Sequence, residues 1–186
     1  MNPTDEQLYT RFLKERAESD IRILLDRYRE PLTFFINGIV HNMDDAEDLA
    51  MDCFAIIVSG TAHYHPRVDA SFKTWLYAIA KKQAYMWLRR NKHMMSDIDE
   101  AIDTGEISSD EDMPESHLIT DERNKRIYDA LKRLNADYAT ALYLTYYEDM
   151  KVEQIARIMH KSAKQVYNLL SRGKTSLREL LSDEDL

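Results

Sequence analysis

Apolar residues recur at intervals of three and four positions through most of the chain, which is the spacing of amphipathic helices. In the first half this pattern predicts four helices, the second of them over about residues 20–40 with a bend at Pro31. Gln7 stands three residues after Thr4, so a capping box is expected to start the first helix. The expected N-caps of the first, third and fourth helices are Thr4, Asp44 or Asp45, and Ser71.

The third predicted helix combines an apolar stripe with a cluster of acids. The apolar positions follow the spacing of one buried helix face: Ala46, Leu49, Ala50, Cys53, Phe54, Ile57 and Val58. The carboxylates gather in the first two turns: Asp45, Glu47, Asp48 and Asp52. The helix dipole favours the earliest of these acids at that end, which is a sufficient structural reason for those.

The fourth predicted helix lies in a segment, residues 70–96, that has no acid but six Lys or Arg and five aromatic residues. On a helical wheel one face is apolar and is expected to be core: Phe72, Leu76, Ile79, Met86 and Trp87, with Trp75 at its margin. Tyr77, Lys81 and Tyr85 follow each other at intervals of four, and we expect this ridge to point away from the core. Bases interleaved with aromatics favour unpaired nucleic acid, whereas the alternative is an ordinary solvated basic face.

The last 60 residues predict four more helices, over about 121–134 and 137–147, then a short helix, a turn at residues 160–162 and a longer helix. The longer helix has one apolar face: Val166, Leu169, Leu170, Gly173, Leu177 and Leu181. Its other face is basic and bears an amide: Lys164, Asn168, Ser171, Arg172, Thr175 and Arg178. This order matches a helix-turn-helix that reads the major groove, and the alternative is a helical hairpin with a solvated face.

Composition supports an all-α protein of two small helical domains joined by an acidic linker. The chain has only four Gly and four Pro and no Asn-Gly or Asp-Gly hairpin signal. Its net charge of −8 belongs to the middle, because residues 94–122 hold eleven acids and no base. We therefore expect domains at 1–93 and 123–186, separated by a flexible linker at 94–122.

Several classes of protein are disfavoured by the sequence. The single Cys53 argues against disulfides and fits a reducing compartment, and the polar N-terminus does not resemble a signal peptide. The longest apolar run is too short to span a membrane, so a cytoplasmic protein without membrane insertion is expected. His63 and His65 lack a third metal ligand fixed by helical spacing, and no Gly-rich phosphate loop or paired Cys motif is present. We expect no metal, no cofactor and no enzymatic activity.

Three segments together resemble bacterial RNA polymerase sigma factors of the extracytoplasmic-function group. The first is Asp45-Ala46-Glu47-Asp48-Leu49 followed by Phe54. The second is Ser71-Phe72-Lys73-Thr74-Trp75-Leu76-Tyr77-Ala78-Ile79-Ala80 followed by Leu88-Arg89-Arg90. The third comprises Glu153-Gln154-Ile155-Ala156, the run from Val166 to Arg172, and Leu177.

The resemblance implies a role for each segment. The third helix would dock on the largest polymerase subunit through Asp45, Glu47, Asp48, Leu49, Asp52 and Phe54. The loop at 62–70 and the fourth helix would recognise and melt the minus-ten promoter element through Tyr64, Arg67, Lys73, Trp75, Tyr77, Lys81 and Tyr85. The last helix would read the minus-thirty-five element as duplex through Lys164, Gln165, Tyr167, Asn168, Ser171, Arg172 and Lys174. The acidic linker would pass through the channel used by nascent RNA, and an anti-sigma factor is a frequent further partner in this group.

Some positions depart from the family pattern. The recognition helix opens with Lys164-Gln165-Val166-Tyr167-Asn168-Leu169 where Gly-Thr-Val-Lys-Ser-Arg is common, so no promoter sequence can be carried over. Met51 and Cys53 replace polar residues on the third helix. Two alternatives remain: a helix-turn-helix regulator that acts without polymerase, and a helical adaptor that binds only protein.

Overall fold

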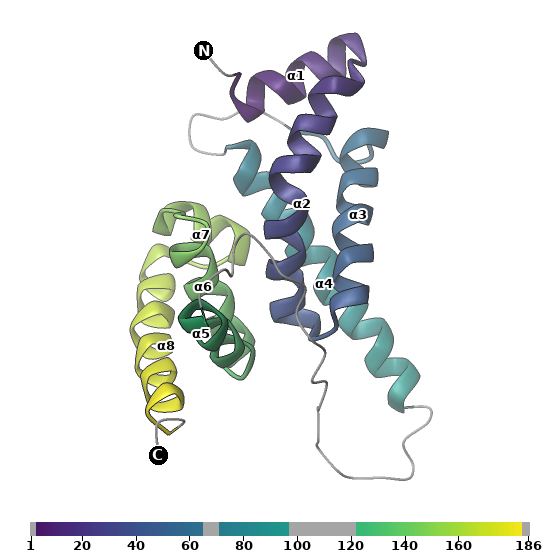
Figure 1. The fold of residues 1–186 in the computed structure, drawn as a ribbon. Helices are drawn as coiled ribbons and strands as arrows, with labels where there is room; N and C mark the ends of the chain where they lie inside the picture. The colour runs from purple at the N-terminus through teal and green to yellow at the C-terminus, as the bar shows by residue number, and fades with distance from the viewer. Residues whose placement is uncertain (1–2, 65–70, 97–121, 184–186) are drawn as a thin grey trace.

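The computed structural model describes residues 3–64, 71–96 and 122–183 (Figure 1). Within these ranges every regular element is an α-helix, as the composition predicted. The N-terminal helices are α1 (Asp5–Glu15), α2 (Glu18–Val40), α3 (Met43–Ser59) and α4 (Phe72–Ser96). The C-terminal helices are α5 (Glu122–Lys132), α6 (Ala136–Tyr146), α7 (Val152–Met159) and α8 (Ala163–Asp183).

Two of the expected helix caps are confirmed. In α1 the Gln7 N–H donates to Thr4 Oγ1 at 3.3 Å, and the Thr4 N–H donates to Gln7 Oε1 at 3.0 Å. In α4 the Thr74 N–H donates to Ser71 Oγ at 3.2 Å. These bonds satisfy main-chain donors that have no partner inside the helix.

The expected cap of α3 is wrong by two or three residues. Asn42 holds the N-cap position with an extended backbone, and its Oδ1 accepts the Asp45 N–H at 2.9 Å. Asp44 and Asp45 lie instead in the first turn, where the helix dipole still favours their charges.

Helix α2 is the centre of the N-terminal group and packs against α1, α3 and α4 (Figure 1). It runs without a break through Pro31, and its inward side chains, among them Leu24, Leu32 and Ile36, are fully buried. Helix α3 lies along α2 through the buried Ala46 and Ala50, whose small side chains permit a close approach.

The predicted helix-turn-helix is confirmed in α7 and α8. Helix α7 ends at His160, which adopts the left-handed conformation with φ of 53°. Ser162 then caps α8, because its Oγ accepts the Gln165 N–H at 3.2 Å while its own N–H donates to Gln165 Oε1 at 2.8 Å. These two reciprocal bonds form a capping box at the start of α8.

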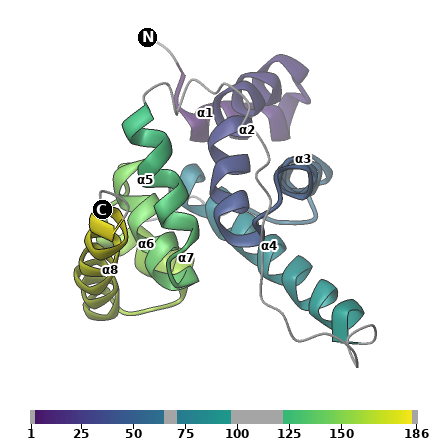
Figure 2. The same cartoon turned by 60° about the horizontal axis from the view of Figure 1, so that its bottom comes forward.

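The two groups of helices pack against each other and share a hydrophobic core (Figures 1 and 2). Helices α5 and α6 contact α2, and α7 lies on α4. Phe34 packs edge-on against Tyr128 with ring centroids 5.5 Å apart, and Phe35 packs against Tyr143 at 5.7 Å. The C-terminal end of α4 extends beyond this contact, as Figure 2 shows.

Candidate nucleic-acid interface

The expected outward ridge on α4 is wrong for Tyr77. Its side chain is fully buried and packs edge-on against Phe35, with ring centroids 5.1 Å apart. Burial, with the neighbouring Tyr143 and Glu148, raises the pKa of Tyr77 well above its usual value. The helical wheel found a second face correctly, but at Tyr77 that face is buried against Phe35 of α2, near Tyr143 and Glu148, and is not exposed to solvent.

The other two members of the ridge are only partly exposed. The Lys81 ammonium lies 4.9 Å from the centroid of the Tyr85 ring, a cation–π distance. Burial lowers the pKa of Lys81, while nearby Asp137 raises it and Lys161 lowers it further. Asp137 lies in the first turn of α6 and Lys161 in the turn before α8, so the part of the ridge that carries Lys81 faces the C-terminal group.

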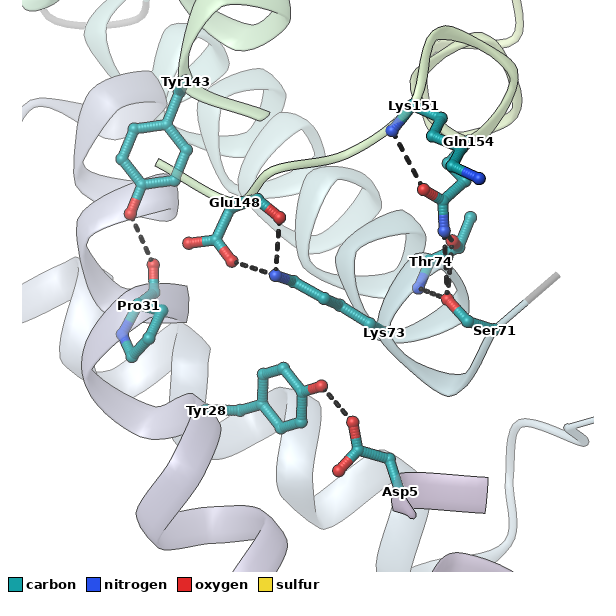
Figure 3. A network of polar contacts seen from close by, with 10 residues as sticks. All are labelled: Asp5, Tyr28, Pro31, Ser71, Lys73, Thr74, Tyr143, Glu148, Lys151 and Gln154. Carbon is teal, nitrogen blue, oxygen red and sulfur yellow. Dashed lines mark hydrogen bonds and ion pairs between the residues drawn. The ribbon is translucent and has the colours of Figure 1, made fainter. Parts of the chain in front are cut away.

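Lys73, another residue expected to contact DNA, is held by a carboxylate from the loop between α6 and α7 (Figure 3). Its Nζ lies 2.9 Å from Glu148 Oε2 and donates to the Glu148 main-chain oxygen at 2.8 Å. Glu148 is only 6% exposed. Sequence reasoning missed this residue, because a pair of acids before a short helix has no distinguishing pattern.

Uncharged side chains add further hydrogen bonds between the two groups (Figure 3). Gln154 Nε2 donates to Thr74 Oγ1 at 3.1 Å and to Ser71 Oγ at 3.3 Å. The Tyr143 hydroxyl donates to the Pro31 carbonyl at 3.0 Å, and the Tyr128 hydroxyl donates to the Phe34 carbonyl at 2.7 Å. These three side chains thus pair their polar groups across the contact.

Two of the expected minus-ten residues belong to an aromatic cluster at the start of α4. Tyr64 is nearly buried, and its ring centroid lies 5.3 Å from that of Trp75. Tyr9 of α1 completes the cluster at 5.4 Å from Trp75. Trp75 is partly buried, as its marginal position on the wheel predicted. Arg67 lies outside the described residues.

Exposed bases nevertheless remain on α4 in this arrangement: Lys82, Arg89 and Arg90. The last two lie toward the end of the helix that extends beyond the C-terminal group (Figure 2). They form a basic surface that the C-terminal helices do not cover.

On α3 the structure divides the expected polymerase-binding residues. Leu49 and Phe54 are buried in the core, so their placement in a contact surface is wrong. Glu47, Asp48 and Asp52 are exposed, whereas Asp45 is half-buried. Met51 and Val58 are exposed beside them, although Val58 was expected in the buried stripe. The outer face of α3 is therefore both acidic and apolar.

On α8 the expected outward placement is confirmed for every candidate side chain. All seven are exposed: Lys164, Gln165, Tyr167, Asn168, Ser171, Arg172 and Lys174. Tyr167 is 60% exposed. Lys174 Nζ lies 5.4 Å from the ring centroid of Tyr146, an exposed aromatic residue of α6 that sequence reasoning missed.

The opposite face of α8 is only partly a core face. Val166 and Leu170 are buried, and Gly173 packs closely on α6. Leu177 and Leu181 instead line an open groove of about 760 Å³ between α5, α6 and α8. The predicted apolar stripe therefore extends past the core of its own domain.

Neither a metal cluster nor a membrane span is found in the described ranges. No three His, Cys, Asp or Glu side chains among those residues lie close enough together to hold a metal ion. His63 is described, whereas His65 lies outside those residues. No helix in the same ranges has both the length and the apolar character needed to cross a bilayer.

Two family models match the chain in the order of its two helical groups. The model described as Sigma-70 region 2 matches residues 24–94. The model described as Sigma-70, region 4 matches residues 124–177. Together they cover about two thirds of the sequence.

Curated relatives align over most of their own length. The RNA polymerase sigma factor YlaC of Bacillus subtilis is 27% identical over 88% of this chain and 93% of the relative. The ECF RNA polymerase sigma-E factor of Haemophilus influenzae is 28% identical over 83% of this chain and 85% of the relative.

Solved structures share the fold. The sigma factor RpoE in complex with the anti-sigma factor NepR from Bartonella quintana has a TM-score of 0.67 at 22% identity, covering 88% of this chain and 97% of that one. CnrH in complex with the cytosolic domain of CnrY also has a TM-score of 0.67, at 17% identity, covering 96% and 97%. Since both sigma-70 regions are present in order and the relatives span most of the sequence, the chain belongs to the extracytoplasmic-function group of RNA polymerase sigma factors, which act in transcription initiation.

Proposed function

We propose that this sigma factor distributes its contacts with core RNA polymerase and promoter DNA over three surfaces. The outer face of α3 binds polymerase, α4 with the loop before it binds the minus-ten strand, and the outer face of α8 reads the minus-thirty-five duplex. The chain acts by binding and not by catalysis, and it works in the cytoplasm, where polymerase and promoter meet.

The observation that carries the proposal is the exposed face of α8. Its candidate side chains combine bases, amides and hydroxyls, and residues 163–178 contain no acid. Arg and Lys can donate to guanine, and Asn and Gln can form paired hydrogen bonds with adenine in the major groove. A helix that follows a capped turn is the usual way to place such side chains there.

The α3 surface supports polymerase binding through a different chemistry. Glu47, Asp48 and Asp52 supply charge for orientation, while Met51 and Val58 supply apolar area that is costly to leave in water. Exposed apolar side chains among charges are typical of protein contact surfaces.

The α4 surface has the right chemistry but is covered. Lys73, Lys81 and Tyr85 could contact phosphates and stack on bases, yet each faces the C-terminal helices here. DNA binding by this surface therefore requires the two groups of helices to separate. Because the sigma factor RpoE, which shares this fold, was solved in complex with the anti-sigma factor NepR, we include an anti-sigma factor among the proposed partners.

Transcription from genomic DNA with core polymerase, followed by sequencing of RNA 5′ ends, tests the function. The full chain should produce discrete start sites with shared upstream elements. Start sites identical to those of core polymerase alone would overturn the proposal. Asn168→Ala should change upstream-element preference while binding to core polymerase persists, and Glu179→Gln on the exposed end of the same helix is the matched control.

A further inference from the structure

The C-terminal helices cover α4 through contacts that fix both ends of the covered face. At one end Gln154 of α7 bonds to Ser71 and Thr74. Farther along, Asp137 and Lys161 face Lys81. Glu148 holds Lys73 at the same end as Gln154, because Lys73 stands between Ser71 and Thr74 in the sequence (Figure 3). The side chains proposed to meet DNA are thus engaged within the chain itself.

Glu148 is the central group of this contact. Its side-chain and main-chain oxygens both accept from Lys73 Nζ, at 2.9 and 2.8 Å. The loop that presents it is shaped by Asp149, whose φ is 50°, and by a hydrogen bond from the Met150 N–H to the Leu144 carbonyl at 3.0 Å. Two of the three N–H donors of the Lys73 ammonium are therefore engaged by one residue, which competes with a phosphate for this charge.

The contact combines shared apolar packing with polar pairs. Its hydrogen bonds join polar groups that water can solvate once the helices part. Contacts between domains of one chain commonly resemble transient interfaces. A nearly buried ion pair is sensitive to the loss of one partner, because the remaining charge is left without compensation.

The outer face of α8, which is the second proposed DNA surface, stays exposed while the C-terminal helices pack on α4. Helix α8 packs only on α5, α6 and α7 among the helices of the described ranges, and its outer face is exposed. The closed chain therefore presents the upstream-reading helix while it hides much of α4.

We propose that the pairing of Glu148 with Lys73 is an autoinhibitory latch that holds the C-terminal helices over the minus-ten surface of the free chain. This inference rests on the proposed function of α4. Single-stranded DNA competes with Glu148 for the same ammonium, so strand binding and closure exclude each other. A ligand that binds only the open form shifts the population toward it.

The distance between the two groups of helices in the free, full-length chain tests the latch directly. Spin labels at Ala55→Cys on α3 and Glu179→Cys on α8 occupy exposed positions, and the native Cys53 is fully buried. In double electron–electron resonance the parent should give one short distance. Glu148→Gln should shift the open-to-closed ratio by about tenfold and add a longer distance. Asp149→Asn is the matched control. It changes the adjacent, exposed carboxylate to an amide, and it alters the net charge by the same amount as Glu148→Gln.

A binding measurement uses a fluorescent thymidylate strand of about 20 nucleotides. Glu148→Gln should bind this strand about tenfold more tightly than the parent, whereas Asp149→Asn should match the parent. Unchanged distances and unchanged strand affinity in Glu148→Gln would overturn the latch. Longer distances without tighter strand binding would uphold the latch and overturn the assignment of α4 to DNA.

A second variant guards against misfolding of the first. Tyr143→Phe keeps the ring but removes the hydroxyl that donates to the Pro31 carbonyl, so it should also open the chain, to a smaller extent. Helix content by circular dichroism should equal that of the parent for both variants. If both are folded and both keep the parent distance, the latch is wrong.

Discussion

Tyr77 of α4 packs edge-on against Phe35 of α2 at 5.1 Å, and its hydroxyl makes no hydrogen bond among the described residues. The ring contributes to the shared core, and the hydroxyl is buried beside Glu148. Burial is the main cause that raises the pKa of Tyr77, and Tyr143 and the charge of Glu148 raise this pKa further. A residue expected to stack on DNA bases is therefore part of the contact between the two groups of helices.

Tyr77→Phe should leave the free energy of unfolding unchanged or raise it by about 1 kcal/mol, because it removes a buried hydroxyl that lacks a partner. Tyr77→Ala should lower it by about 3–5 kcal/mol through loss of the ring. Urea denaturation measures both. A loss of stability in Tyr77→Phe would show that the hydroxyl is bonded, with Glu148 as the candidate acceptor.

Two glycines inside helices provide a matched pair. A Cβ added at Gly173 would lie 3.1 Å from Leu142 Cδ1 and 3.2 Å from Tyr138 Cβ, whereas one added at Gly38 would meet nothing within 4 Å. Gly38→Ala should raise the free energy of unfolding by about 0.5–1 kcal/mol, since alanine loses less entropy in a helix.

Gly173→Ala should instead lower the free energy of unfolding by about 1 kcal/mol, because Leu142 is buried and cannot move aside without strain. Thermal denaturation of the two variants compares them directly. A gain in stability for both would show that α6 yields to the added methyl group, and that the close approach of α8 is not required.

Local pattern predicted the helices, because caps and apolar spacing act within one element. The Thr4 and Ser71 caps are examples, and so is the buried face of α8 at Val166 and Leu170. The role of the second face of α4 could not be predicted, since its cover comes from residues about 75 positions away in the sequence. A helical wheel distinguishes faces but does not say whether water, DNA or another helix covers them.

The ion pair between Arg11 and Asp20 predicts a pH dependence of stability. Arg11 donates two hydrogen bonds to the buried Asp20 carboxylate, which lowers the Asp20 pKa from its usual 3.8, while burial opposes the change. The folded state then binds the proton more weakly than the unfolded state. The contribution of this ion pair to the stability of the fold is fully present above the unfolded pKa of 3.8. It is lost as the pH falls through the lower pKa of Asp20 in the folded state.

Asp20→Asn should accordingly have a lower urea midpoint than the parent at neutral pH, and the difference should shrink between about pH 4 and about pH 2. Replacing Asp48, an exposed acid of α3, by Asn is the control and should change the midpoint little at either pH. A difference between Asp20→Asn and the parent that stays constant down to the lowest pH would contradict the charge-based account of this pair.

The outer face of α3 offers the sharpest test of polymerase binding. Met51 is 46% exposed among acids, and Leu13 on α1 is 42% exposed, so the two are matched in exposure. Met51→Lys removes apolar contact area and reverses the local charge, and should weaken binding to core polymerase by about tenfold. Leu13→Lys should leave that affinity unchanged, because Leu13 belongs to α1 and not to the outer face of α3. Fluorescence anisotropy with labelled sigma factor measures both affinities. Equal affinities for the two variants would place the polymerase contact somewhere other than α3.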